Sequence, residues 1–249
     1  MKELFRSPLE ERLKKWHNED WHTTKGRIIR DVVYAIDTGL VTTVAFLAGI
    51  SVSLVTKNKL IIAGLIQITS GTVAIFFGSY ISTKAQKHFF ENQIDRERKE
   101  IEDDPDKETM EIREIFSDMG FSEPEQEIAV KRITVNKDVW LKFMVQEEIG
   151  ISPGIIDNPF EIAFISAFSF LVGALPAILP VFVFNNLSLG LTAAFLSVLV
   201  FLFILGCSKS RITKVNWLLS AMETLFIGLI SSGTGFFLGL FVARLFEHH

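Results

Sequence analysis

The chain has 249 residues, of which 49% are hydrophobic and 22% are charged. Together with 23 phenylalanines, this apolar content exceeds what one soluble core of this size requires, so it indicates a membrane protein. The single cysteine, Cys207, excludes an internal disulfide and any metal cluster built on several cysteines. The net charge is −4, but residues 91–148 hold 18 acidic and 9 basic residues, which sets an acidic segment apart from a basic remainder.

Residues 1–28 are predicted to form an amphipathic cytoplasmic segment. Within 3–21, apolar residues recur at helical spacing beside a basic face, which is typical of a helix lying on a membrane surface. The first apolar run lacks the small-residue cleavage site of a signal peptide, so we expect the N-terminus to stay in the cytoplasm.

Five segments are long and apolar enough to cross a bilayer, whose hydrocarbon core of about 30 Å takes roughly 20 helical residues. They cover residues 31–56, 60–83, 160–184, 187–207 and 215–246. Spans 1 and 2 then belong to a region 29–83, and spans 3 to 5 to a region 159–249. The expected fold class is an all-α membrane protein of about five transmembrane helices.

The region between spans 2 and 3, residues 84–158, is expected to be an acidic helical insert. Three helices fit it, over 84–102, 107–119 and 124–149, and Ser122 with Glu125 predicts a capping box at the start of the third. Lysines and arginines lie before the first span and between the fourth and fifth, so the positive-inside rule places the N-terminus and the insert in the cytoplasm.

The insert carries carboxylates at spacings that place them on shared helix faces. Two pairs of glutamates are three residues apart, and a methionine and a glutamate on the third predicted helix are four apart. Carboxylates together with one thioether suit Fe²⁺ or Mn²⁺. The alternative is a solvated acidic surface with an ordinary core methionine. The candidate ligands are Glu97, Glu100, Glu108, Glu111, Met144 and Glu148.

The run Trp-Leu-Lys-Phe-Met at 140–144, followed by Glu-Glu-Ile-Gly at 147–150, resembles the vacuolar iron transporter family of plant and yeast vacuolar iron and manganese transporters and nodulin-like relatives. The resemblance extends over about 28–246. Counted from this run without a gap, the metal-domain ligands of the family fall on all six candidates, whereas the second methionine of the family falls on Val145.

The resemblance implies a homodimer in a lipid bilayer that exports Fe²⁺ or Mn²⁺ from the cytosol, often in exchange for protons, with Co²⁺ and Zn²⁺ as alternative ions. It implies neither a tightly bound cofactor nor a nucleic-acid partner nor an enzyme. The membrane would be the cell membrane in a prokaryote and a vacuole-like membrane in a eukaryote. Dimerisation is also suggested by small residues along the first span, at Gly39, Thr42, Ala45 and Gly49, which permit close backbone approach.

The expected ion path departs from the pattern of the family. An Asp-Gly-Leu run is typical of the first span, but here Thr38 separates Asp37 from Gly39 and takes the aspartate position. In the second span, Ile75 replaces an expected methionine and Gln67 an acidic residue.

Ionisable groups inside spans are costly, so Asp37 and Glu223 are candidates for the path. The alternatives are that Asp37 caps a helix break next to Gly39, and that Glu223 makes a buried hydrogen bond to Ser220 or Thr224.

Two other functions remain open. A metal sensor or partner protein without transport would keep the acidic insert and lose the ligands of the path. A di-iron membrane oxidase is less favoured, since such bundles use Glu-x-x-His motifs and the insert has no histidine after residue 88.

Overall fold

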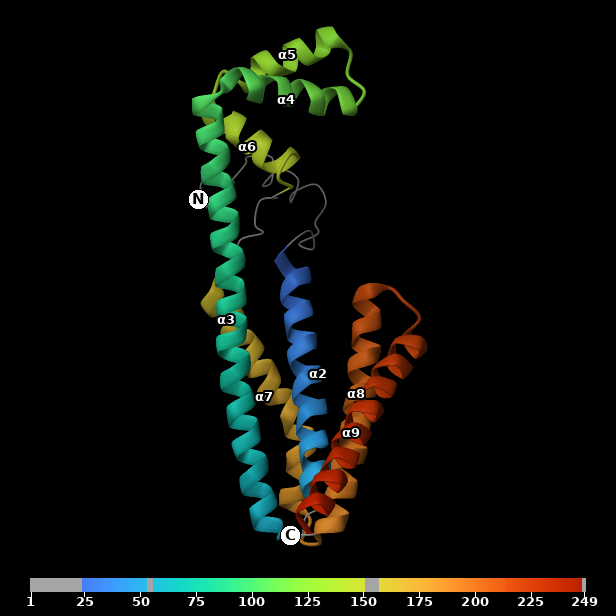
Figure 1. Ribbon diagram of the computed structural model, residues 1–249. Coiled ribbons are helices and arrows are strands. Elements are labelled where there is room, and N and C mark those ends of the chain that lie inside the picture. Colours follow the sequence, from blue (N-terminus) through green and yellow to red (C-terminus); the bar gives the residue numbers. More distant parts are fainter. Residues whose placement is uncertain (1–23, 53–55, 151–156, 248–249) are drawn as a thin grey trace. The chain divides into compact units, whose positions relative to one another are not determined.

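The computed structural model describes residues 24–52, 56–150 and 157–247, and every regular element in these ranges is a helix (Figure 1). The amphipathic helix predicted over residues 3–21 lies outside the described part of the chain. The helices in chain order are α2 (Thr24–Ser51), α3 (Lys57–Asp103), α4 (Pro105–Asp118), α5 (Glu123–Ile133), α6 (Lys137–Glu147), α7 (Pro159–Val183), α8 (Leu187–Thr213) and α9 (Trp217–Glu247).

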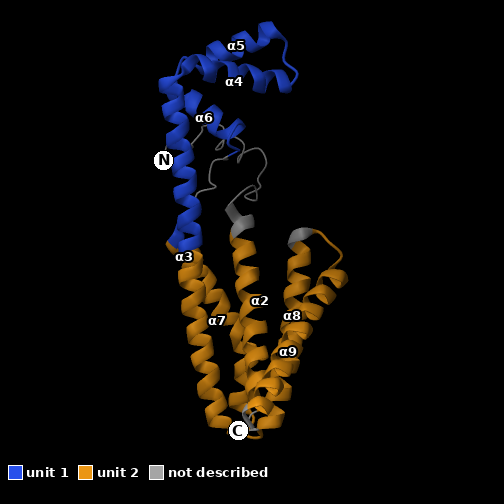
Figure 2. Ribbon diagram, viewed as in Figure 1, with its two compact units in different colours: residues 1–26, 81–159 blue, residues 27–80, 160–249 orange. Residues whose placement is uncertain are grey.

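The chain divides into two compact units (Figure 2). One contains Arg27–Tyr80 and Phe160–His249, and we call it the membrane unit. The other contains Ile81–Pro159 together with Met1–Gly26, and we call its 81–159 part the insert. Helix α3 belongs to both units, because no glycine or proline interrupts the chain between Gly78 and Pro105.

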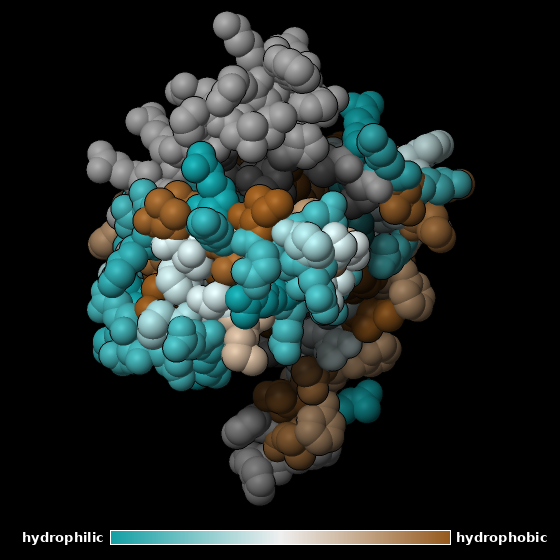
Figure 3. All heavy atoms as spheres, turned by 90° about the horizontal axis from the view of Figure 1, so that it is seen from above, coloured by the Kyte–Doolittle hydropathy of each residue, from teal (hydrophilic) through white to brown (hydrophobic). Residues whose placement is uncertain are grey.

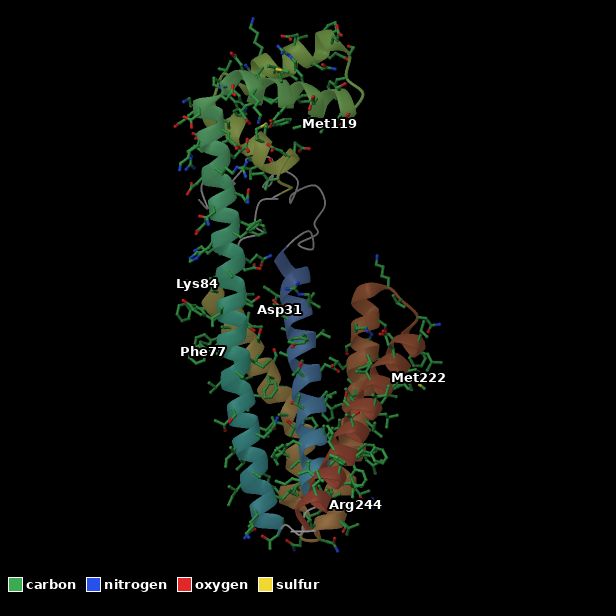
Figure 4. All side chains as sticks on the ribbon, in the orientation of Figure 1. Asp31, Phe77, Lys84, Met119, Met222 and Arg244 are labelled. Atoms are coloured by element: carbon green, nitrogen blue, oxygen red, sulfur yellow. The ribbon has the colours of Figure 1, made fainter. Side chains whose placement is uncertain are left out.

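Five helices, α2, α3, α7, α8 and α9, are long and apolar enough to cross a membrane, which confirms the predicted all-α membrane class. Many apolar side chains of the membrane unit point outward instead of into a core. Phe77 on α3 and Met222 on α9 are two such exposed residues (Figure 4). An outward apolar surface of this kind is what contact with lipid requires.

Helix α2 packs closely against two other helices of the membrane unit. A Cβ atom at Gly39 would collide with the backbone of Phe170 on α7, and Gly49 lies against the backbone of Gly235 and Gly239 on α9 (Figure 1). Small residues allow such approaches in membranes. Three of the four small residues that suggested a dimer, Gly39, Ala45 and Gly49, are thus used inside the chain, and dimerisation itself stays a prediction.

Helix α7 contains Pro176 and Pro180. Proline has no N–H, so Pro180 leaves the carbonyl of Pro176 without its usual partner four residues on. The hydroxyl of Ser197 on α8 donates a hydrogen bond to that carbonyl. This bond supplies the missing partner and ties α8 to α7, which is how membrane helices tolerate internal prolines.

The insert has its own apolar core beneath a polar exterior. Figure 3 looks onto α4 and α5, where hydrophilic side chains predominate with apolar ones between them. The buried residues come from all four of its helices and are Ile94, Ile101, Ile112, Val130, Trp140, Leu141, Met144 and Val145.

The single helix predicted over 124–149 is wrong, because the chain forms α5 and α6 with a break at residues 134–136. Asn136 has an extended backbone, and its side-chain oxygen accepts hydrogen bonds from the N–H groups of Asp138 and Val139. Asparagine is a favoured N-cap, so it starts a second helix here. The predicted capping box is present, with Glu125 accepting a bond of 2.8 Å from the N–H of Ser122.

Candidate metal centre

Three glutamates from three helix segments meet in the insert. Glu97 lies on α3, Glu108 on α4 and Glu148 at the C-terminal end of α6, and each offers one carboxylate oxygen within 4.8 Å of the other two. The chain reverses between Glu97 and Glu108 at Asp104, whose side chain caps α4 by accepting the N–H of Lys107. We call these three residues the carboxylate triad.

Two members of the triad are buried. Glu97 is 2% exposed and Glu108 1%, whereas Glu148 is exposed. Within the described residues, neither Glu97 Oε1 nor Glu108 Oε2 has a hydrogen-bond partner. A buried carboxylate oxygen without a donor is costly, and a cation bound between the carboxylates is one way to remove that cost. The residues present therefore fit a cation.

The electrostatics of the triad also favour a bound cation. Burial, followed by the charges of Glu148 and Glu108, raises the pKa of Glu97 to about 8. Burial also raises the pKa of Glu108, with the charge of Glu111 as the next cause. For Glu148, burial and the charges of Glu111 and Glu100 raise the pKa. Like charges held this close favour protonation unless a cation neutralises them.

The other three predicted ligands take different positions. Glu100 accepts a hydrogen bond of 3.0 Å from Arg96, and Glu111 accepts one of 2.8 Å from Lys107. Both act on Glu148 through their charge without joining the close contacts of the triad. Met144 is fully buried in the core of the insert, one helical turn before Glu148, a position that suits a core methionine as well as a ligand.

The prediction from sequence missed the cations of this site. Lys107 and Arg96 each precede their partner glutamate by four residues, which is the spacing of an ion pair on one helix face. That spacing is visible in the sequence and marks both residues as neighbours of the candidate ligands. Oxygen donors alone suit Mg²⁺, Ca²⁺, Mn²⁺ and Fe²⁺, so the triad by itself defines a hard cation site.

The predicted path residues lie in the membrane unit. Asp37 and Thr38 are half-buried on α2, and the hydroxyl of Thr38 bonds back to the carbonyl of Tyr34 at 2.7 Å. Helix α2 continues through this region, so the alternative of a helix break next to Gly39 is wrong. On α3, Ile75 is half-buried.

Gln67 joins α3 to α2 through two hydroxyl groups. The hydroxyl of Thr43 donates to its oxygen at 3.2 Å, and its nitrogen donates to the hydroxyl of Thr42 at 3.4 Å. The amide thus occupies a polar position between two membrane helices, where an acidic residue was expected from the resemblance.

Glu223 on α9 pairs with Lys209 on α8 at 3.2 Å. The predicted alternative of a bond to Ser220 or Thr224 is wrong, since those hydroxyls donate to the carbonyls of Gly206 and Ser220. The pairing with Lys209 joins residues 14 apart in the chain, and no local spacing predicts it.

A model of the VIT family matches residues 29–240. The chain belongs to the VIT family. Vacuolar iron transporter 1 of Arabidopsis thaliana is 29% identical over 93% of this chain and 91% of its own length. The vacuolar iron transporter of Toxoplasma gondii is 31% identical over 91% of this chain and 79% of its own, and that of Plasmodium falciparum is 27% identical over 90% and 87%. These VIT family relatives are named as transporters, not enzymes, and the resemblance seen in the sequence is confirmed.

Proposed function

We propose that this protein exports divalent transition-metal ions, Fe²⁺ or Mn²⁺, from the cytosol in exchange for protons. The observation that carries the proposal is the carboxylate triad, in which Glu97 and Glu108 are buried and the described part of the chain offers no hydrogen-bond donor to one oxygen of each. The names of the relatives, which are iron transporters, support the same ion class.

In this proposal the insert collects the ion on the cytosolic side. Glu97, Glu108 and Glu148 supply the closest oxygens, while Glu100 and Glu111 add negative charge around them. Met144 adds a thioether that Mg²⁺ and Ca²⁺ do not need, which would favour Fe²⁺ and Mn²⁺ over the more abundant hard cations, with Co²⁺ and Zn²⁺ as further substrates. The triad holds cargo, and no resident cofactor is required.

The translocation step is assigned to Asp37, with Thr38, Gln67, Ile75 and Glu223 as further candidate positions of the path. A carboxyl group in an apolar span can be neutralised by a proton or by a cation, and the two compete for it. Competition at one carboxylate couples outward metal movement to inward proton movement without ATP.

A second copy of the chain is proposed to complete the path. A hollow of about 540 Å³ on the membrane unit is lined by Phe46 of α2 and by residues of α3 that include Gln67 and Ser70. An amide and a hydroxyl facing lipid are unfavourable, so coverage by the same face of a second copy would shield them.

The proposed orientation has the N-terminus and the insert in the cytosol. Positive charge marks that side, with Arg30 near the start of α2, Lys209 and Arg211 in the last turns of α8, and Lys214 just after it. The membrane would be vacuole-like in a eukaryote, as the names of the relatives suggest, or the cell membrane in a prokaryote.

Metal uptake into sealed vesicles containing the purified protein tests the proposal. The wild type should accumulate Mn²⁺ faster with an outwardly directed proton gradient, where the vesicle lumen is acidic. Asp37→Asn keeps the shape of the side chain but removes its charge, so uptake should fall at least tenfold, while Mn²⁺ binding by the insert persists.

Glu97→Gln combined with Glu108→Gln should instead weaken Mn²⁺ binding. Uptake by Asp37→Asn at the wild-type rate and pH dependence would show that the path lies elsewhere.

A sensor or partner protein without transport is the second candidate. The observation that favours it is the loss of two expected ligands, with Thr38 and Ile75 in their places. In that case vesicles would show Mn²⁺ binding that depends on Glu97 and Glu108 and no accumulation under any pH gradient.

A further inference from the structure

Of the two cations beside the acidic site, Lys107 is the one whose ion pairs include a member of the carboxylate triad. The ammonium nitrogen of Lys107 lies 2.8 Å from Glu111 Oε1 and 3.8 Å from Glu108 Oε1. Its charge also acts on Glu100 and on Glu148. Lys107 therefore interacts with four of the five glutamates that the sequence selected as ligands.

The fold holds the backbone of Lys107 and leaves most of its side chain exposed to solvent. Lys107 lies in the first turn of α4, where its N–H is bonded to the capping side chain of Asp104 at 3.3 Å. Its side chain is 60% exposed, whereas that of Glu108 is 1% exposed. Solvent can thus receive the ammonium group if it leaves the site, but the carboxylate of Glu108 stays inside.

We propose that Lys107 is an internal counter-cation that offsets part of the negative charge of the carboxylate site in the metal-free protein and is displaced when a divalent ion binds. The inference rests on the proposed function, since it assumes that the triad binds metal. Two cations at the same carboxylates repel each other, so binding of a metal includes breaking the contacts of Lys107 with Glu111 and Glu108. Lys107 would then set the concentration at which the site fills.

Titration calorimetry of Mn²⁺ into the full-length protein in detergent tests this role. Lys107→Gln removes the competing charge and should lower the dissociation constant roughly tenfold, the size expected for a unit charge near a divalent ion in a water-like dielectric. Lys107→Arg keeps the charge and should bind within about twofold of the wild type. Lys131→Gln removes an exposed lysine from α5 of the same insert and serves as the matched control. Lys107→Met repeats the loss of charge with an apolar chain.

The outcomes separate this inference from the proposed function. Mn²⁺ binding that Glu97→Gln with Glu108→Gln abolishes, together with unchanged or weaker binding by Lys107→Gln and Lys107→Met, overturns the role of Lys107 alone. A wild type that binds no Mn²⁺ overturns the metal centre and this inference with it. Tighter binding by both neutral variants and wild-type affinity in Lys107→Arg support displacement of the charge.

Discussion

Glu97 is a buried carboxyl group of the insert whose surroundings disfavour its charged form. Burial and the neighbouring charges of Glu148 and Glu108 raise its pKa from an ordinary 4.5 to about 8, so in the folded metal-free protein it holds a proton at pH values where the unfolded chain has lost it. The folded state then binds more protons than the unfolded state between these two values. Stability must therefore fall as the pH rises through this window.

We expect the metal-free protein to unfold several degrees higher at pH 5 than at pH 8.5, as followed by thermal unfolding in detergent with a chelator present. Mn²⁺ should reverse the trend by stabilising the protein most at pH 8.5, where protons no longer compete for Glu97. Glu97→Gln removes one of the three groups with a raised pKa and should reduce the slope of the metal-free profile, whereas exposed Glu114→Gln should leave the slope unchanged. A metal-free protein that is more stable at pH 8.5 than at pH 5 would contradict the burial of Glu97.

At the scale of single helices, one hydroxyl of α8 bonds to α7 beside its internal prolines. Ser197→Ala leaves the carbonyl of Pro176 without the partner that replaces the missing N–H of Pro180. Hydrogen bonds between membrane helices contribute about 0.6–2 kcal/mol, and we expect a loss of stability in that range. Thermal unfolding in detergent measures it.

Thr234→Ala is the matched control, since its hydroxyl donates to the carbonyl of Ile230 within its own helix at 2.8 Å. Equal stability of the two variants would show that the hydrogen bond from Ser197 to Pro176 does not contribute to the stability of the protein.

A second prediction at this scale concerns the contact of α2 with α7. A Cβ atom at Gly39 would meet the carbonyl oxygen of Phe170, and one at Gly173 would meet the carbonyl of Ile36. Backbone cannot give way as a flexible side chain does, so Gly39→Ala should separate the helices and cost about 1–3 kcal/mol. Resistance to proteolysis and the unfolding temperature in detergent should both fall.

Gly78→Ala provides the comparison, because nothing lies within 4 Å of a Cβ atom there. It should be neutral or slightly stabilising, since alanine favours a helix over glycine. Equal behaviour of Gly39→Ala and Gly78→Ala would argue against close packing of α2 on α7.

At the scale of the whole molecule, the structure distinguishes Ala45 from Thr42, although the sequence offers both as small residues of the first span that could contact a second copy. Ala45 lies against Gly235 within the chain, whereas Thr42 is exposed beside Gln67. If two copies meet at this face, a cysteine introduced at Thr42 should cross-link in a protein whose Cys207 is replaced by serine. A cysteine at Ala45 should not. Cross-linking is read as a dimer on a denaturing gel.

Cross-linking at Ala45 but not at Thr42 would contradict the packing of α2 against α9, and cross-linking at neither would remove the proposed shared face. The comparison requires that both variants stay folded, which their elution from a sizing column in detergent checks.

Local patterns predicted most of the architecture. The five spans follow from runs of apolar residues as long as a bilayer is thick, and the extension of α3 follows from the absence of glycine and proline between Gly78 and Pro105. The break before α6 was missed, because Asn136 lies within an otherwise helical sequence and only its cap geometry shows that it starts a helix. Hydrophobic periodicity continues across such a break and gives no sign of it.

The sequence by itself determined the membrane class, the acidic insert and a set of six candidate ligands, because length, composition and spacing along one helix are local properties. Only the tertiary structure decided that Glu97, Glu108 and Glu148 meet and that Gly39 and Gly49 are used inside the chain. The physical reason is that these contacts join residues brought together by the reversal at Asp104, by the position of α6 in the core of the insert, and by the packing of separate helices. The spacing of residues along the chain does not indicate which helices pack together.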